Sequence, residues 1–424
     1  MNKIHLLALS FLIGITPIVS ADKAPHQMSM KEMLDKIPPM KGKTPVQWRV
    51  IWTGNASKEA RISWSTAEKT KKNIVHYGTV DKKRNIKNYP LHKNCQVNGQ
   101  YTLDPSEESL SAAYYHHADL EKLKADTQYY FVLESDGERS PRFYFKTAPK
   151  KGTKFSLIVG GDSRSGHKAR CRMNLFMAQQ VKRFPEHLAL IHGGDYVVHG
   201  NKYAQWRLWL SHHELTTNKD GRVLPIIPAK GNHDAGVLYH EAFNIPVVGK
   251  KEMAKQPGSC HVVTLGKDVA IVTLNTNRSA AHQVEWLEEQ LKRLRPKTKW
   301  LLTQYHRPFY PAVKGPGAHG KVFVPLFEKY DVDLACESDG HCIKRTVPIR
   351  DDKEDPTGVT YIGEGGLGVG QYHPKVDRWY LAKGAVSRGH HTMSLKFRSK
   401  KLQITVNRLE GEIFDTHTLN RRKK

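Results

Sequence analysis

Five short apolar runs in this 424-residue chain each lead into a polar cluster, and this pattern constrains the fold more than any other feature. The clearest case is the run 224–229, which leads into Gly231-Asn232-His233-Asp234. A short apolar run bounded by turn residues is typical of a buried strand. Ligands collect at the carboxyl ends of the strands in open α/β sheets. Five such endings therefore predict one crevice in an α/β domain.

The residues at these endings are carboxylates, imidazoles and one amide. The other four runs are 155–159, 188–191, 300–303 and 332–336. Such ligands suit zinc, manganese or iron better than a calcium cage, and six of them suit two metals that share a carboxylate. Any one of these residues alone is better explained as a turn former, so the prediction depends on the set. The predicted metal ligands are Asp162, Asp195, Asn232, His306, Asp339 and His341.

The order of these motifs resembles that of the calcineurin-like metallophosphoesterases: Gly-Asp, Gly-Asp, Gly-Asn-His-Asp, His and a final His. The segment His306-Arg307-Pro308-Phe309-Tyr310 is similar to the His-x-Pro-x-Tyr segment of the purple acid phosphatase branch. The resemblance covers residues 45 to 419. It implies an enzyme that hydrolyses phosphoric esters, with an α/β catalytic domain of four layers.

The resemblance also implies roles for single residues. Asp195 bridges two divalent or mixed-valence ions of iron, manganese or zinc, and the other ligands divide between them: Asp162 and His341 on one, and Asn232, His306 and Asp339 on the other. His233 is the predicted catalytic acid or phosphate-oxygen donor, and Asp234 is predicted to fix its tautomer. The alternative for His233 is a purely structural role.

Three positions depart from the family pattern. Arg164 stands where many members have a metal-binding histidine, and its permanent charge favours a clamp on a phosphate oxygen. Val198 stands at the position of the tyrosine ligand of the purple enzymes, which predicts a protein without tyrosinate–iron colour. His199, the next residue, is either a replacement ligand, a substrate contact or an ordinary loop histidine. Asp339 stands where the first histidine of a Gly-His-x-His ending is usual, which favours manganese, magnesium or iron over zinc.

One more histidine is a predicted substrate contact. His319 lies in the glycine-rich loop 314–320, which follows the His306 segment. Members of the family that this chain resembles often place substrate-contacting histidines in this region. The prediction is therefore that His319, together with Arg164 and His199, meets the substrate.

Residues 45–149 are predicted to form an all-β sandwich. Runs such as 47–52, 60–65 and 128–133 alternate with a period of two, and about seven short strands in this length are typical of an antiparallel sandwich. The segment resembles the fibronectin-type-III-like N-terminal domain of purple acid phosphatases. Residues 22–44 are predicted to be a linker. Residues 150–424 are predicted to form the catalytic domain, which includes C-terminal strands within 390–419.

The first 21 residues have the pattern of a cleavable signal peptide. Lys3 precedes an almost wholly apolar stretch at 6–19, and Val19-Ser20-Ala21 offers a small-residue cleavage site. No other apolar segment is long enough to span a bilayer. The mature protein is therefore predicted to be secreted or periplasmic. Five cysteines, an odd number, argue against a disulfide framework.

The chain is strongly basic, with a formal net charge of +26 from 67 Lys and Arg against 41 Asp and Glu. Such an excess of positive charge attracts anions. In the alternative interpretation, many of these side chains are simply solvated. A phosphorylated small-molecule substrate is the first hypothesis, so the predicted function is hydrolysis of phosphate monoesters. The alternatives are a phosphodiesterase or nuclease acting on anionic polymers, and a non-catalytic polyanion-binding protein on a degenerate phosphatase scaffold. The sequence leaves the oligomeric state open.

Overall fold

The computed structural model describes residues 23–152, 154–248 and 259–422. The predicted signal peptide, residues 1–21, lies outside these ranges. No helix in the described part of the chain has the length and hydrophobicity needed to cross a bilayer. All five cysteines lie within the described ranges and are free thiols. Packing and hydrogen bonds, without disulfides, therefore hold these parts of the chain together.

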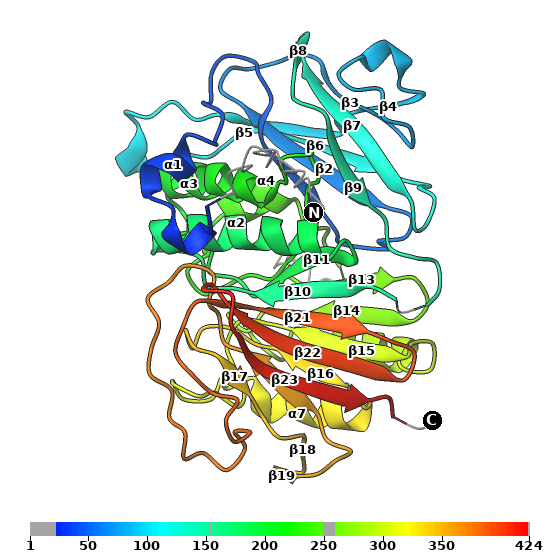
Figure 1. The fold of residues 1–424 in the computed structure, drawn as a ribbon, viewed down its shortest axis with the longest axis vertical. Coiled ribbons are helices and arrows are strands. Elements are labelled where there is room, and N and C mark those ends of the chain that lie inside the picture. The colour runs from blue at the N-terminus through cyan, green and yellow to red at the C-terminus, as the bar shows by residue number, and fades with distance from the viewer. Residues whose placement is uncertain (1–22, 153, 249–258, 423–424) are drawn as a thin grey trace, which may run out of the picture.

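The N-terminal region is an all-β sandwich, as predicted (Figure 1). Its first sheet contains β1 (Val46–Ile51), β2 (Ala60–Thr66), β5 (Val97–Gln100) and β6 (Tyr114–Leu120). Its second sheet contains β3 (Asn73–Gly78), β4 (Leu91–Asn94), β7 (Gln128–Ser135), β8 (Glu138–Arg139) and β9 (Phe143–Lys146). Alternate side chains of both sheets, such as Trp64, Val75 and Phe131, are buried in one cluster. The apolar residues that recur with a period of two in the sequence therefore form the sandwich core.

The sandwich shares a sheet with the catalytic region. β1 pairs in parallel with β12 (Ile226–Pro228), and the Trp52 amide donates a 2.9 Å hydrogen bond to the Ile226 carbonyl. The ten strands run in the order β23-β22-β21-β10-β11-β12-β1-β2-β6-β5. The buried Arg49 side chain also crosses between the two regions, because its Nε donates to the Ala242 carbonyl at 2.8 Å. The domain limits at 149 and 150 stay a prediction, and a continuous sheet crosses them.

The catalytic region contains two sheets whose central strands are parallel. The first consists of β10 (Ser156–Gly160), β11 (His187–His192), β12, β21 (His391–Phe397), β22 (Lys401–Arg408) and β23 (Ile413–Asn420). The second consists of β13 (His261–Leu265), β14 (Val269–Thr273), β15 (Trp300–Gln304), β16 (Leu334–Cys336), β17 (Lys344–Arg345) and β20 (Thr360–Gly363). A separate hairpin pairs β18 (Ile349–Arg350) with β19 (Lys353–Glu354). The polar clusters of the sequence follow β10, β11, β12, β15 and β16.

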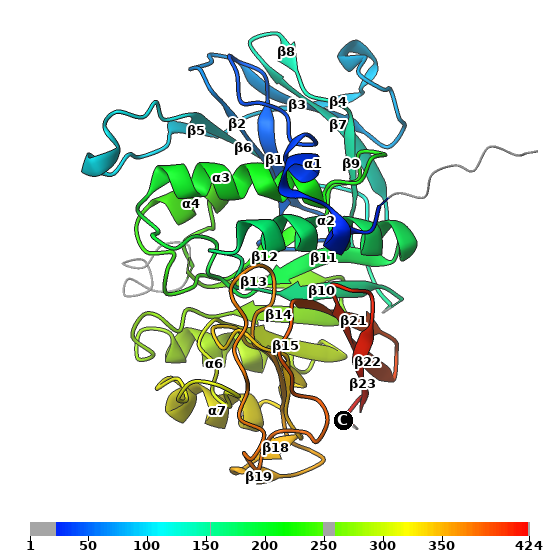
Figure 2. The same ribbon diagram turned by 60° about the vertical axis from the view of Figure 1, so that its left-hand side comes forward.

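Side chains alternate between the two faces of each strand, so each sheet packs on the other sheet with one face and on helices with the other. The two sheets and the two sets of helices make four layers. Leu157 of the first sheet and Leu302 of the second belong to one shared core, whereas Ile158 faces the helices on the other side. Those helices are α2 (His167–Arg183), α3 (Tyr203–His213) and α4 (Leu238–Phe243). The outer face of the second sheet packs on α6 (Val284–Leu294) and α7 (Gly320–Lys329), as Figure 2 shows. Helices therefore cover both outer faces, which confirms the predicted α/β catalytic fold.

The segment before the sandwich packs on the catalytic region. It holds η1 (Pro25–Gln27) and α1 (Met30–Leu34), and Met28 and Met33 are buried against Cys171 of α2. The remaining short helices are η2 (Ile86–Asn88), η3 (Pro105–Glu107) and η4 (Glu214–Thr216). The described part of the predicted linker, residues 22–44, thus forms a small core together with the catalytic region.

Candidate metal centre

Six polar side chains gather at the carboxyl ends of the parallel strands, and we call this group the carboxylate centre. Five of the six are buried and Asn232 is half-buried. Four have left-handed backbones, with φ of +55° at Asp162, +59° at Asp195, +69° at Asp339 and +56° at His341. Non-glycine residues adopt this conformation rarely, mostly at sharp turns and functional sites. The members are Asp162, Asp195, Asn232, His306, Asp339 and His341.

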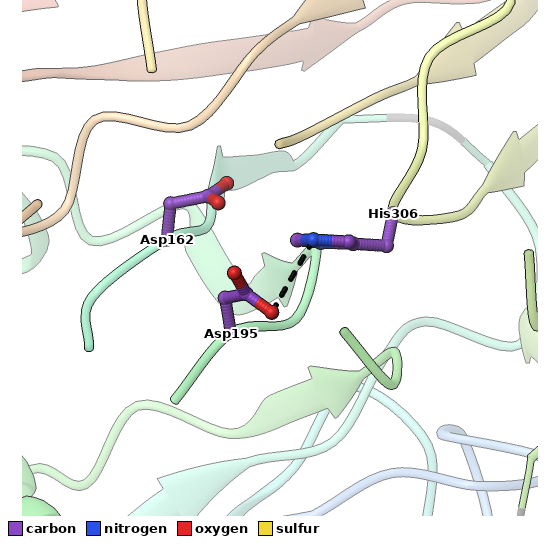
Figure 3. Close-up of side chains that lie close together, drawn as sticks. All are labelled: Asp162, Asp195 and His306. Atoms are coloured by element: carbon purple, nitrogen blue, oxygen red, sulfur yellow. Dashed lines mark ion pairs between the residues drawn. The ribbon is translucent and has the colours of Figure 1, made fainter. Parts of the chain in front are cut away.

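The side chains of the carboxylate centre face a common space. Asp162, Asp195 and His306 each offer a ligand atom within 4.8 Å of the others, and Figure 3 shows their polar ends turned toward one another. The Nε2 atom of His306 lies 3.3 Å from Asp195 Oδ1, 3.5 Å from Asp339 Oδ1 and 3.0 Å from Asn232 Oδ1. All six predicted ligands are thus brought together, since His341 Nε2 also lies 3.3 Å from Asp162 Oδ1.

Several carboxylates lie close together in this space, so nearby positive charge stabilises their ionised form. Burial lowers the pKa of the His306 imidazole, but the charge of Asp195 and hydrogen bonds to Asp195 and Asp339 raise it well above its ordinary value. Burial raises the pKa of Asp195, but His306 outweighs this effect and lowers it to about 2. The protein alone therefore stabilises ionised carboxylates here, the form that binds a metal.

Two further cations of the chain reach the carboxylate centre. Arg164 Nε donates to Asp195 Oδ2 at 3.2 Å, and Lys314 Nζ donates to Asp339 Oδ1 at 2.6 Å. The motif pattern indicates Arg164 but not Lys314. The signal for Lys314 was the extra carboxylate at position 339, which replaces a neutral imidazole and needs a counter-charge. Nothing in the sequence pattern indicated which of the many lysines supplies it.

Orphaned polar atoms show that the site fits a metal. Asp162 Oδ1 and both ring nitrogens of His341 are buried and have no hydrogen-bond partner among the described residues. Buried polar atoms without partners cost about 1–3 kcal/mol each, so such atoms usually mark a missing ligand. Carboxylate oxygens and imidazole nitrogens are the donors that iron, manganese and zinc accept. Gly365 lies directly against the Asp162 carboxylate. A Cβ atom at position 365 would lie 2.0 Å from Asp162 Oδ2, so a side chain there would clash with this ligand.

His233 stands at the rim of the carboxylate centre. Its Nδ1 is 2.7 Å from the Val198 carbonyl, so this nitrogen carries the proton of the neutral ring and donates it. The other nitrogen, Nε2, lies 4.0 Å from Asp195 Oδ2. The side chain is 32% exposed, which leaves it within reach of a substrate. The ring is therefore oriented by a backbone carbonyl.

The predicted role of Asp234 is wrong. Its buried carboxylate accepts hydrogen bonds from the backbone amides of Asp195, Tyr196 and Gly231 at 2.8, 2.9 and 2.7 Å, whereas the His233 ring bonds the Val198 carbonyl. Burial and the charge of Asp195 raise the pKa of Asp234 to about 7. Asp234 thus braces the loop that presents Asp195, whereas the Val198 carbonyl orients His233.

The remaining predicted residues lie farther out, and one unpredicted aromatic residue lies close. His199 is exposed, and among the described residues it forms hydrogen bonds through its backbone. His319 directly precedes α7 and lines a cavity beside Asn232. Tyr372 stacks on the His341 ring with centroids 5.0 Å apart and planes at 11°. No motif surrounds Tyr372, so the sequence carried no signal for this contact.

Two family models match the chain. Residues 45–147 match the model described as purple acid phosphatase, N-terminal domain, and residues 167–342 match calcineurin-like phosphoesterase. The chain belongs to the calcineurin-like metallophosphoesterases, in the purple acid phosphatase branch. It is therefore a metal-dependent hydrolase of phosphoric esters, and its cofactor is a pair of metal ions.

Relatives of this metallophosphoesterase cover most of its length. It is 24% identical to purple acid phosphatase 18 of Arabidopsis thaliana over 83% of this chain and 78% of that protein. It is 23% identical to Fe(3+)-Zn(2+) purple acid phosphatase 12 of the same plant over 90% of this chain and 85% of that protein. The structure of purple acid phosphatase PPD1 from yellow lupin (Lupinus luteus) superposes with a TM-score of 0.72 at 18% identity, covering 89% and 75% of the two chains. This last likeness supports the fold.

Proposed function

We propose that this metallophosphoesterase is an exported phosphatase that hydrolyses phosphate monoesters at the carboxylate centre. The observation that carries the proposal is the set of orphaned atoms on Asp162 and His341, together with the ligand atom that Asp162 offers within 4.8 Å of one on the ionised Asp195. Asp195 is the shared ligand in this proposal. The other ligands divide into two groups: Asp162 with His341, and Asn232 with His306 and Asp339.

The chain's own residues have distinct tasks in this reaction. Two bound metal ions supply Lewis acidity, which activates water and neutralises the phosphate charge. Among the described residues Arg164 donates only to Asp195, through Nε, so its other N–H groups can hold a phosphate oxygen. His233, held by the Val198 carbonyl through Nδ1–H, enters this step as the imidazolium; it gives the Nε2 proton to the leaving oxygen when the P–O bond breaks and returns to the neutral Nδ1–H ring. The Asp234 brace keeps Asp195 in place throughout.

Export and the choice of metal complete the proposal. The signal-peptide pattern at residues 1–21 supports secretion or transfer to a periplasm, and the mass of the exported protein tests cleavage after Ala21. Asp339 adds a third carboxylate to the centre, and this supports iron or manganese over zinc. The basic surface supports binding of anionic substrates.

The test compares an aryl phosphate monoester with the matching diester, using protein reconstituted separately with manganese, zinc and iron. Asp195→Asn removes the shared charge and is expected to lower monoester turnover by at least about a thousandfold. The exposed Asp35→Asn, directly after α1, is the matched control and should retain wild-type turnover. Faster diester cleavage would instead indicate a phosphodiesterase. Absence of turnover with all three metals would indicate a binding protein on a phosphatase scaffold.

A further inference from the structure

An open cavity of about 720 Å³ adjoins the carboxylate centre. Asn232 belongs to both, so the cavity begins where the proposed metal ligands end. Its walls come from the loop 276–280, Arg307 and residues 318–319. A volume of this size is typical of a small-molecule site. The cavity is therefore placed to receive the part of a substrate that lies beyond the scissile phosphate.

The lining of this cavity is positively charged. It includes Arg278, Arg307 and His319, and none of the described residues that line it is a carboxylate. Both arginines are exposed, and neither forms an ion pair with an acidic residue in the described part of the chain. Surface arginines commonly pair with carboxylates, and a guanidinium without such a partner retains the planar N–H pairs that bind phosphate or carboxylate groups. The charge of the wall thus selects for an anion.

Hydrogen bonds hold the backbone of this wall in place. Asn277 Nδ2 donates to the Lys230 carbonyl at 2.9 Å, and its Oδ1 accepts from Arg307 Nε at 3.2 Å. The Arg307 amide donates to Thr276 Oγ1 at 2.8 Å. These bonds use the Nε of Arg307 and leave its terminal nitrogens available. The wall is therefore ordered before any ligand arrives, which lowers the entropy cost of binding.

Neighbouring groups add to the positive potential. α7 begins directly after His319, and its N-terminal end favours negative charge.

We propose that this cavity is a subsite for a second anionic group, phosphoryl or carboxylate, carried by the leaving group of the substrate. The proposal rests on the proposed function, because it requires the ester phosphate to lie at the carboxylate centre. The preferred substrates are then doubly anionic: diphosphates, bisphosphorylated compounds or phosphorylated carboxylic acids. For inorganic pyrophosphate, one water is consumed, one bridging P–O bond breaks, and two phosphates form.

The test measures kcat and KM for three substrates: para-nitrophenyl phosphate, inorganic pyrophosphate and 3-phosphoglycerate. The variants are Arg278→Gln, Arg307→Gln and the double variant. Each single substitution is expected to raise KM for the doubly anionic substrates about tenfold, and the double variant about a hundredfold. Values for para-nitrophenyl phosphate should change by less than about twofold. A loss confined to pyrophosphate identifies a phosphoryl subsite, and one confined to 3-phosphoglycerate identifies a carboxylate subsite.

The double variant Lys400→Gln/Lys401→Gln is the matched control, because it removes two exposed charges from the β21–β22 hairpin. It should leave all three substrates unchanged. Equal losses for all three substrates in the arginine variants, or no loss for any, would overturn the subsite. Thermal unfolding shows whether the variants fold, and Arg278→Gln is the safest of them, since no described residue bonds its side chain.

A binding measurement separates this proposal from the proposed function. Calorimetric titration of metal-loaded protein compares methylenediphosphonate with methylphosphonate, neither of which is hydrolysed. A preference for the diphosphonate that falls at least tenfold in the double arginine variant supports the subsite even if no ester turns over. An unchanged preference, or none, overturns the subsite even if monoesters are hydrolysed.

Discussion

Two neighbouring clusters of buried charge are built differently. The first is the carboxylate centre. The second, the Lys344 cluster, consists of Lys344, Glu337 and Glu364, all fully buried. Lys344 Nζ contacts both glutamates and also donates to the Tyr310 carbonyl at 3.0 Å. A hydrogen bond from the His341 amide to the Glu364 carbonyl, 2.6 Å long, joins the two clusters.

The clusters differ in whether their charged atoms find counter-ions and hydrogen-bond partners within the protein. Glu337 Oε1 accepts from the Tyr305 hydroxyl at 2.8 Å and the Phe309 amide at 2.7 Å, and Ala312 donates to Glu364 Oε1 at 2.7 Å. Only Glu364 Oε2 lacks a partner in the part of this cluster that the structure describes. Buried charges are costly unless paired. The Lys344 cluster carries its own counter-ion and is structural, whereas the carboxylate centre needs cations from outside. Unpartnered atoms, more than buried charge, mark the ligand site.

The largest effect is expected from Lys344→Met, which tests the claim that the Lys344 cluster is structural. The substitution leaves two buried carboxylates without a counter-ion and should lower the free energy of unfolding by about 3–5 kcal/mol. Denaturant unfolding measures the change. Lys321→Met, an exposed lysine on α7, is the control and should change stability by less than about 0.5 kcal/mol. A loss below about 1 kcal/mol for Lys344→Met would remove the contrast between the clusters.

A smaller effect is expected from Glu364→Gln in metal-free protein. Burial and the charge of Glu337 raise the pKa of Glu364 from 4.5 to about 7, despite the opposing charge of Lys344. The folded protein therefore keeps a proton that the unfolded chain releases, and stability falls as pH rises from 4.5 through 7. The variant escapes this loss and should be more stable at pH 8 by about 3 kcal/mol. Near pH 4.5 the two proteins should be alike, and equal stabilities at both pH values would contradict the assigned ionisation.

The smallest effect concerns the cation that enters the carboxylate centre. Lys314 occupies Asp339 Oδ1, so Lys314→Met should free this ligand and tighten manganese binding about tenfold. Calorimetric titration of metal-free protein with Mn²⁺ measures the change directly. Lys321→Met serves again as the control. Weaker binding in Lys314→Met would mean that the lysine orients Asp339 for the metal.

Local pattern was enough to predict much of this protein. The period of two predicted the sandwich strands, and apolar spacing within 281–294 predicted the helix α6. The endings of the apolar runs brought together all six members of the carboxylate centre. These predictions succeed because side-chain direction follows the backbone repeat, and because parallel strands end at one edge of a sheet.

The tertiary structure alone decided the finer points of the site. The Lys314–Asp339 pair, the Asp234 brace, the Tyr372 stack on His341 and the cavity at Arg278 all join segments that carry no shared pattern. The pairing of β12 with β1 likewise joins two segments that no sequence pattern connects. The sequence determined which residues end each strand, since that depends on neighbours along the chain. Which distant side chains meet within hydrogen-bond distance depends on how the layers pack, and a few ångströms of packing separate an ion pair from two solvated charges.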